Sequence, residues 1–222
     1  MRTIIISGGK IEDTFALEWM KNHPYDLLVA ADSGMEFLYR NQMMPDVIAG
    51  DFDSVEKDAY EHFADKEENA EQDKKPEILR LNPVKDDTDT EFVIREAIRR
   101  GATAISILGG TGTRMDHVLG NVHLLGIGVE AGVEIEIVDA HNRIRMVSRE
   151  LVISREAQFG EYISVLPFGG DAKGVTLEGF RYPLEDVVLK SVSSLGISNE
   201  IVEEQAIVKV ADGVLLVIEA RD

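Results

Sequence analysis

The first half of the chain repeats one pattern, a short apolar run that stops abruptly at glycine, aspartate or serine. An unbroken apolar run of this kind is typical of a strand buried on both faces, as in a parallel sheet covered by helices. The runs lie at 4–7, 27–31, 47–49 and 104–108, and helical stretches follow the first two at about 13–22 and 35–41. The pattern predicts an α/β fold, an open and mostly parallel sheet with helices on both faces, over residues 1–139.

After residue 139 the helical periodicity disappears and short β-rich runs alternate with turns. These runs lie at 144–147, 151–153, 162–166, 175–177, 187–192, 207–210 and 214–218. Six or seven short strands in about 80 residues predict a small β-sandwich over residues 140–222. Ala211-Asp212-Gly213 separates the last two runs and predicts a hairpin between them.

The run at 47–49 leads into Gly50-Asp51-Phe52-Asp53-Ser54. Side chains two residues apart on extended backbone point the same way, so Asp51 and Asp53 are expected to face together while Phe52 points into the body. Two adjacent carboxylates repel each other, and a divalent cation relieves that repulsion. A plain turn is the alternative, because glycine, aspartate and serine are all turn formers. The pentapeptide alone leaves both interpretations open.

A second acidic cluster, at residues 85–91, precedes a helical stripe of apolar residues that stops at Gly101. Thr88 and Glu91 have the spacing of a capping box, which predicts that the helix begins at Asp89. Interaction with the helix dipole explains one or two acids in a first turn. It explains three poorly, so the cluster favours a second arm of a metal site.

Asp32, Asp51 and Asp53 all follow expected strands, at the edge where ligands bind in an open sheet of this Rossmann-like type. The run at 104–108 opens onto Gly109-Gly110-Thr111-Gly112, whose small residues let backbone N–H groups face a phosphate. Arg114 offers a planar fork to phosphate oxygens, and an ion pair with Asp116 is the alternative. His117 begins a helix that runs to about residue 131, and either acts as a base or only orients its neighbours.

Four motifs together carry a resemblance. GDFDS at 50–54, KDDTD at 85–89, GGTGTRMDH at 109–117 and SLGISNE at 194–200 stand in the order found in the thiamine pyrophosphokinase family, which the chain resembles over most of its length. The resemblance implies transfer of a pyrophosphoryl group from ATP to the hydroxyethyl group of thiamine, giving thiamine diphosphate and AMP. It also implies a homodimer in which the β domain of one chain completes the site of the other.

The resemblance and the acidic pattern together assign roles to residues. Asp51, Asp53 and Asp89 are expected to bind Mg²⁺ and, with Arg114, to carry catalysis. Either Asp51 or Asp53 is expected to accept the alcohol proton. The residues expected to bind ATP are Asp32, Ser33, Gly34, Lys85, Asp86, Thr88, Gly109, Gly110, Arg114, Asp116 and His117. Ser198 and Asn199 are expected to bind thiamine, and the aromatic residue that stacks on it remains open among Phe168, Phe180 and Tyr182.

The charge of the chain limits the classes of partner that it can bind. With 23 basic and 41 acidic residues the formal net charge is −18, which argues against binding nucleic acid or an anionic membrane. The chain has no cysteine, which excludes disulfides and thiolate metal sites. No apolar run approaches the ~20 residues that span a bilayer, and the N-terminus turns polar too soon for a signal peptide. A cytoplasmic protein is expected.

Two other functions fit parts of the pattern. A metal-dependent phosphohydrolase would use the same aspartates to activate water and would ignore thiamine. A non-catalytic nucleotide-binding protein would bind without turnover. Neither requires the motif at 194–200, which counts against both.

Overall fold

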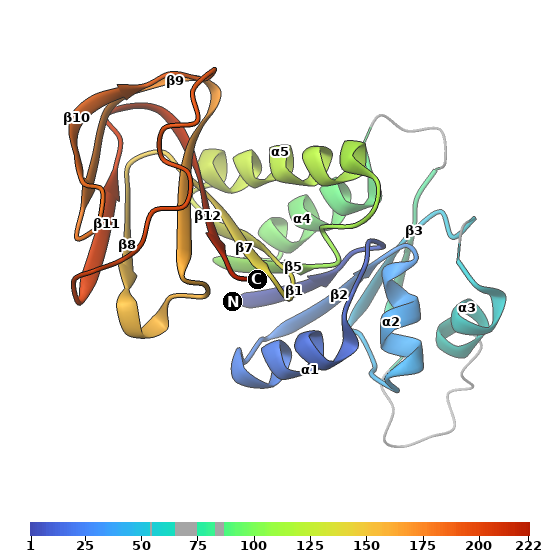
Figure 1. The fold of residues 1–222 in the computed structure, drawn as a ribbon. Helices are drawn as coiled ribbons and strands as arrows, with labels where there is room; N and C mark the ends of the chain where they lie inside the picture. Colours follow the sequence, from blue (N-terminus) through green and yellow to red (C-terminus); the bar gives the residue numbers. More distant parts are fainter. Residues whose placement is uncertain (54, 65–74, 83–86) are drawn as a thin grey trace. The chain divides into compact units, whose positions relative to one another are not determined.

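The structure is a computed structural model that describes residues 1–53, 55–64, 75–82 and 87–222. It divides into two compact units, Met1–Ala140 and His141–Asp222 (Figure 1). The sequence at 56–77 is mostly charged, which predicts a solvated helix followed by a loop. Helix α3, Lys57–Ala64, lies there, and residues 65–74 lie outside the described part of the chain.

The sheet of unit 1 is parallel throughout, and its strands follow the order β4-β3-β2-β1-β5-β6. The strands are β1 (Arg2–Ile6), β2 (Leu27–Ala31), β3 (Val47–Gly50), β4 (Glu77–Arg80), β5 (Ala104–Leu108) and β6 (Glu134–Val138). The central strands are buried along nearly their whole length, as continuous apolar runs predict. The order reverses at β1, whose neighbours β2 and β5 lead away in opposite directions.

The helices cover both faces of this sheet, α1 and α2 on one side and α4 and α5 on the other (Figure 1). They are α1 (Asp13–Asn22), α2 (Gly34–Arg40), α4 (Asp89–Arg99) and α5 (Met115–Ala131). Helix α4 begins where the capping box predicts, because the Thr88 hydroxyl accepts the Glu91 N–H at 3.2 Å. Helix α5 ends at Gly132, which adopts the left-handed conformation that terminates many helices.

Unit 2 is built from strands alone apart from one short 3₁₀ turn, Arg155–Ala157. The strands are β7 (Asn142–Val147), β8 (Glu150–Ser154), β9 (Tyr162–Glu178), β10 (Leu184–Leu189), β11 (Gln205–Lys209) and β12 (Asp212–Ala220). They pack around one cluster of buried aliphatic side chains, with Phe180 among them. The predicted fold class, an α/β sheet followed by a β-sandwich, is confirmed.

The hairpin predicted at Ala211-Asp212-Gly213 is wrong. Strand β11 pairs with β8 and β9, whereas β12 pairs with β7 and β9, so the two strands that flank the turn do not pair with each other. The reason is the length of β9: the runs at 162–166 and 175–177 form one strand of 17 residues. Its first half pairs with β12 and its second half mainly with β11, so the two strands follow one another along β9 and both run antiparallel to it.

Candidate active site

The loops that follow β1, β2 and β5 surround a cleft of about 890 Å³ in unit 1. Its position fits the rule that ligands bind where the strand order of an open sheet reverses. The residues that line it are Ser7, Gly8, Gly9, Lys10, Ala31, Asp32, Ser33, Asp87, Thr88, Asp89, Thr90, Glu91, Gly109, Gly110, Thr111, Gly112, Thr113, Arg114, Asp116, His117, Val118, Gly120, Asn121 and Leu124.

Three carboxylates meet at the edge of this cleft. Asp32 follows β2, Asp51 follows β3, and Asp89 is the first residue of α4; one carboxylate oxygen of each lies within 4.8 Å of the others. All three side chains are half-buried. Asp32 has a φ of 44° and Phe52 a φ of 65°, a left-handed conformation that costs a non-glycine residue roughly 1 kcal/mol or more. The strained backbone therefore lies at Asp32 itself and at the residue directly after Asp51.

Asp53 is exposed beside this group and is not one of its three members. Its backbone N–H donates to Asp51 Oδ1 at 3.2 Å. The negative charge of Asp51 first, and of Asp32 and Asp89 after it, raises the pKa of the Asp53 carboxyl. Of the predicted metal ligands the structure thus brings Asp51 and Asp89 together. It adds Asp32, which the sequence assigned to the nucleotide.

The chemistry of this donor set fits a hard divalent cation. Carboxylate oxygens from three different segments converge, and Mg²⁺ prefers oxygen ligands of this kind. The raised pKa of Asp53 reports the same excess of negative charge. A bound cation would remove that repulsion.

Two glycine-containing loops pack backbone against backbone. The Gly9 N–H donates to the Gly109 carbonyl at 2.9 Å, and the Lys10 N–H donates to the Thr111 carbonyl at the same distance. A Cβ on Gly9 would lie 2.2 Å from the Thr111 oxygen, so only glycine permits this contact. Gly34 is equally enclosed, because a Cβ there would lie 2.1 Å from the Ile6 carbonyl oxygen.

Side-chain hydrogen bonds also fix the loop at 109–112. The Thr111 hydroxyl donates to Asp139 Oδ2 at 2.8 Å, and Asn121 Nδ2 donates to the Gly110 carbonyl at 2.8 Å. These contacts fix the loop before any ligand arrives. Sequence reasoning missed Asn121 and Asp139, because they lie 11 and 28 residues along the chain from the groups they bind.

Arg114 is ion-paired with Asp116, its Nε donating to Oδ1 at 3.2 Å and its Nη2 donating to Oδ2 at 2.5 Å. The structure therefore contains the alternative contact that the sequence left open. The guanidinium lowers the pKa of the Asp116 carboxyl to about 2, and the His117 N–H adds to that effect. Both side chains remain about two-thirds exposed, 68% and 64%, and both line the cleft, so an anion can reach Arg114.

Lys10 is a second cation of the cleft and was not predicted. Its side chain is exposed and forms no ion pair with any residue in the described ranges. Its place directly after Gly8-Gly9 is the signal that would have found it. The predicted ATP residues Ser33, Thr88, Gly109, Gly110 and His117 also line the cleft, while Lys85 and Asp86 lie outside the described residues.

The thiamine residues predicted in unit 2 differ from each other in exposure. Ser198 is exposed, with a φ of 54°, and its N–H donates to Ser164 Oγ at 3.1 Å. Asn199 is buried: its Oδ1 accepts the N–H groups of Tyr182 and Glu200, and its Nδ2 donates to the Tyr182 carbonyl at 2.8 Å. Asn199 therefore acts as a clamp between two loops.

The three aromatic residues considered for stacking on thiamine also differ in exposure. Phe180 belongs to the buried core of unit 2, Phe168 is half-buried, and Tyr182 is 62% exposed. Burial leaves Phe180 no face to offer a ligand. Tyr182, next to the Asn199 clamp, presents its ring to the surface.

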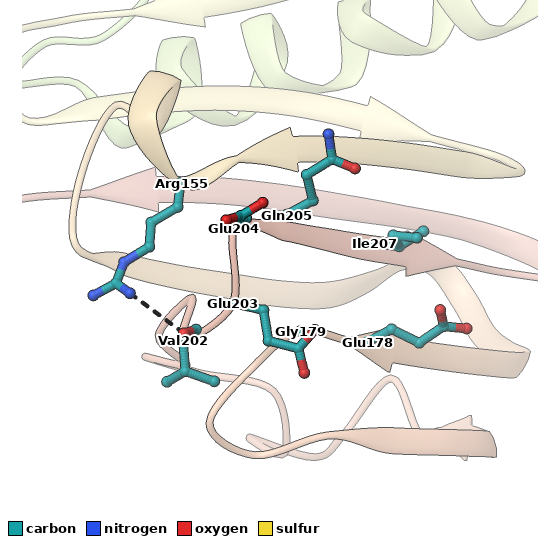
Figure 2. A pocket seen from close by; sticks show the side chains of 8 residues that line it. All are labelled: Arg155, Glu178, Gly179, Val202, Glu203, Glu204, Gln205 and Ile207. Atoms are coloured by element: carbon teal, nitrogen blue, oxygen red, sulfur yellow. Dashed lines mark hydrogen bonds between the residues drawn. The ribbon is translucent and has the colours of Figure 1, made fainter.

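A second hollow, of about 680 Å³, lies in unit 2 (Figure 2). Glu178, Glu203 and Glu204 contribute its acidic side chains, and Arg155 donates a hydrogen bond to the Val202 carbonyl at 3.3 Å across one end. None of the predicted site residues lines it. A run of exposed acids is by itself an ordinary solvated surface, so this hollow adds nothing to the site.

The model of the thiamin pyrophosphokinase catalytic domain matches residues 19–137, and the model of the thiamin pyrophosphokinase vitamin B1 binding domain matches residues 149–215. The chain belongs to the thiamin pyrophosphokinase family. It is 31% identical, over 222 residues and the whole of both chains, to the thiamine pyrophosphokinase of Bacillus subtilis (strain 168).

Solved structures of the family have the same fold as this chain. The crystal structure of thiamine pyrophosphokinase from Bacillus subtilis superimposes with a TM-score of 0.85 at 29% identity and covers both chains completely. The thiamin pyrophosphokinase of Geobacillus thermodenitrificans gives a TM-score of 0.83 at 28% identity, over 100% of this chain and 98% of the other.

Family membership confirms the resemblance seen in the four motifs, and the chain is an enzyme of the thiamine pyrophosphokinase type. The phosphohydrolase and the non-catalytic nucleotide-binding protein are not favoured. No helix within the described residues is long and apolar enough to cross a membrane.

Proposed function

We propose that the chain transfers the pyrophosphoryl group of ATP to the hydroxyethyl oxygen of thiamine, with Mg²⁺ bound at Asp32, Asp51 and Asp89. One observation carries the proposal: three converging carboxylates border a glycine-rich cleft in a chain that both domain models of this family match. The cleft would take the nucleotide.

Mg²⁺ held by these carboxylates would supply positive charge beside the phosphate oxygens. Asp53 lies close enough to feel their charge and is a further candidate ligand. Three or four acids would otherwise repel the triphosphate, so metal and nucleotide are expected to bind together.

Lys10 and Arg114 are the cations proposed to meet the phosphates from the protein side. Lys10 lies on the loop locked against 109–111 and has no described counter-ion. The guanidinium of Arg114 forms an ion pair with Asp116, and this ion pair fixes the guanidinium beside the cleft. Fixed positive charge stabilises the negative charge that spreads over the phosphoryl oxygens in the transition state.

In the proposed reaction the alcohol oxygen of thiamine attacks the β-phosphorus. The bond from that phosphorus to the oxygen bridging to the α-phosphate breaks, and AMP leaves with the bond's electron pair. The alcohol proton passes to a carboxylate, Asp51 or Asp53. Asp53 is exposed and lies outside the three proposed ligands, so its carboxylate is available to accept this proton when it is not itself ligated.

Thiamine is proposed to bind through unit 2. Ser198 offers an exposed hydroxyl, and Tyr182 an exposed ring on which a heterocycle can stack. Asn199 is proposed to shape this surface by fixing Tyr182 and Glu200. We further propose a cytoplasmic homodimer in which each site combines unit 1 of one chain with unit 2 of the other.

The reaction is tested with purified protein, ATP, Mg²⁺ and thiamine, followed by ³¹P NMR. AMP and thiamine diphosphate formed in equal amounts, and only with thiamine present, would support the proposal. ADP or free phosphate made equally well without thiamine would refute it.

The shared site is tested by mixing Asp51→Asn chains with Ser198→Trp chains, each inactive alone. Random pairing makes half of the dimers mixed, and one of the two sites in a mixed dimer is intact, so about a quarter of the normal activity should return. A mixture that stays inactive while native mass spectrometry shows mixed dimers would rule out a site built from two chains.

A further inference from the structure

The hydroxyl groups of Ser7 and Thr90 form a buried pair in the floor of the cleft. Their oxygens lie 2.8 Å apart, and the two residues are 5% and 8% exposed. They come from segments 83 residues apart: Ser7 directly follows β1, and Thr90 lies in the first turn of α4. Each hydroxyl satisfies the other where water has little access, as buried polar groups require.

The position of this pair is significant because Thr90 directly follows Asp89. The carboxylate of Asp89 lies within 4.8 Å of those of Asp32 and Asp51. Mutual repulsion among the three acids pushes the first turn of α4 away from the sheet. The hydrogen bond to Ser7 opposes this push from the adjacent residue.

Ser7 also contacts the phosphate side of the cleft. The Ser7 N–H donates to the Leu108 carbonyl at 2.8 Å. The Ser7 carbonyl oxygen lies so close to Gly109 that a Cβ on Gly109 would be 2.3 Å from it. One residue therefore contacts both the helix that carries Asp89 and the start of the glycine-rich loop. Its backbone is fixed on the loop side and its hydroxyl on the helix side.

We propose that Ser7 and Thr90 are positioning residues that hold Asp89 at cation-binding distance from Asp32 and Asp51 before the cation arrives. This inference rests on the proposed function, since it takes the three carboxylates as the cation site. The pair acts through Asp89, the residue directly before Thr90. It preorganises the ligands, which would otherwise separate in the metal-free protein.

The test is a titration of the nucleotide-free full chain with Mn²⁺, followed by electron paramagnetic resonance, which needs no turnover. Thr90→Val keeps the shape of the side chain and removes the hydroxyl; Ser7→Ala removes its partner. Each is expected to weaken Mn²⁺ binding roughly 3- to 10-fold, and the double variant no further, because the two hydroxyls act as one unit. Thr90→Ser keeps the hydroxyl and should bind Mn²⁺ with an affinity within about twofold of the wild type.

Thr3→Val is the matched control. Thr3 lies on β1, the strand that leads into Ser7, and is 2% exposed; its hydroxyl has no hydrogen-bond partner within the described residues. Its replacement should leave Mn²⁺ affinity unchanged. In activity assays the Mg²⁺ concentration for half-maximal rate should rise in Thr90→Val and stay constant in Thr3→Val.

Wild-type affinity in Thr90→Val and Ser7→Ala would overturn the inference, and so would strictly additive losses in the double variant. Absence of Mn²⁺ binding by the unaltered chain would overturn it too. If Thr90→Val does not fold, Ser7→Ala and Thr90→Ser decide by the same criteria. A chain that binds Mn²⁺ as expected yet makes no thiamine diphosphate would refute the proposed function and leave the positioning role standing.

Discussion

Replacing Asp51 with asparagine should make the metal-free protein more stable and the enzyme inactive. The amide side chain would keep the shape of the carboxylate and the oxygen that accepts the Asp53 N–H. It would remove one charge from three carboxylates whose oxygens lie within 4.8 Å. Two unit charges at that distance repel by about 1 kcal/mol in water and by about 3.5 kcal/mol at an effective dielectric constant of 20.

Because the three side chains are half-buried and reached by solvent, we adopt the lower figure for each of the two pairs that involve Asp51. The free energy of unfolding should then rise by about 2 kcal/mol. For a chain of this size that corresponds to an increase in Tm of about 4–8 °C. Mg²⁺ should raise the Tm of the wild type by binding only the folded state, and should do so far less in the variant.

Differential scanning calorimetry in EDTA and in excess Mg²⁺ measures both effects. Glu134→Gln, an exposed acid at the start of β6, serves as the control and should change neither value by more than about 1 °C. A metal-free Asp51→Asn protein that melts lower than the wild type would refute the repulsion argument. An undiminished Mg²⁺ shift in the variant would show that the cation binds elsewhere.

Three further predictions concern other parts of the chain. Arg114→Ala should abolish most turnover in the ³¹P assay while the Tm stays within about 2 °C, because an exposed ion pair contributes little to stability; wild-type rates would contradict its assignment. Asn199→Ala should lower the free energy of unfolding by about 1–2 kcal/mol in urea titrations, because the Tyr182 backbone N–H and carbonyl lose the part-buried hydrogen bonds that the amide makes to them. Arg99 and Arg100 lower the pKa of Glu96 from 4.5 to about 2, so the stability advantage of the wild type over Glu96→Gln should be complete above pH 4.5 and vanish as the pH falls toward 2; a pH-independent difference would refute this.

The sequence predicts those parts of the site that depend on local signals. The capping box places the start of α4 at Asp89, and the apolar runs place Asp32 and Asp51 at strand ends. It does not tell which acids meet. That depends on the parallel register in which Ala31 pairs with Ala49, which brings Asp32 beside Asp51 and leaves Asp53 outside.

The missed hairpin has a similar cause. Gly213 adopts a φ of 99° that suits glycine, but the chain does not fold back at Ala211-Asp212-Gly213, because β11 and β12 both run antiparallel to β9. A turn signal states that the chain bends, but not which edge its strands will join. The partner of β11 and β12 is the long strand β9, whose continuity through Gly169 and Gly174 no local pattern reveals.

The pairing of β12 with both β7 and β9 has a consequence for synthesis on the ribosome. Strand β7 emerges about 70 residues before the strand that separates it from β9, so during translation both stand with open edges. Unit 1, whose strands are complete by residue 138, can fold while unit 2 is still being made. Chaperones that shield exposed edges should therefore engage nascent chains halted after β11 and release them once β12 is available.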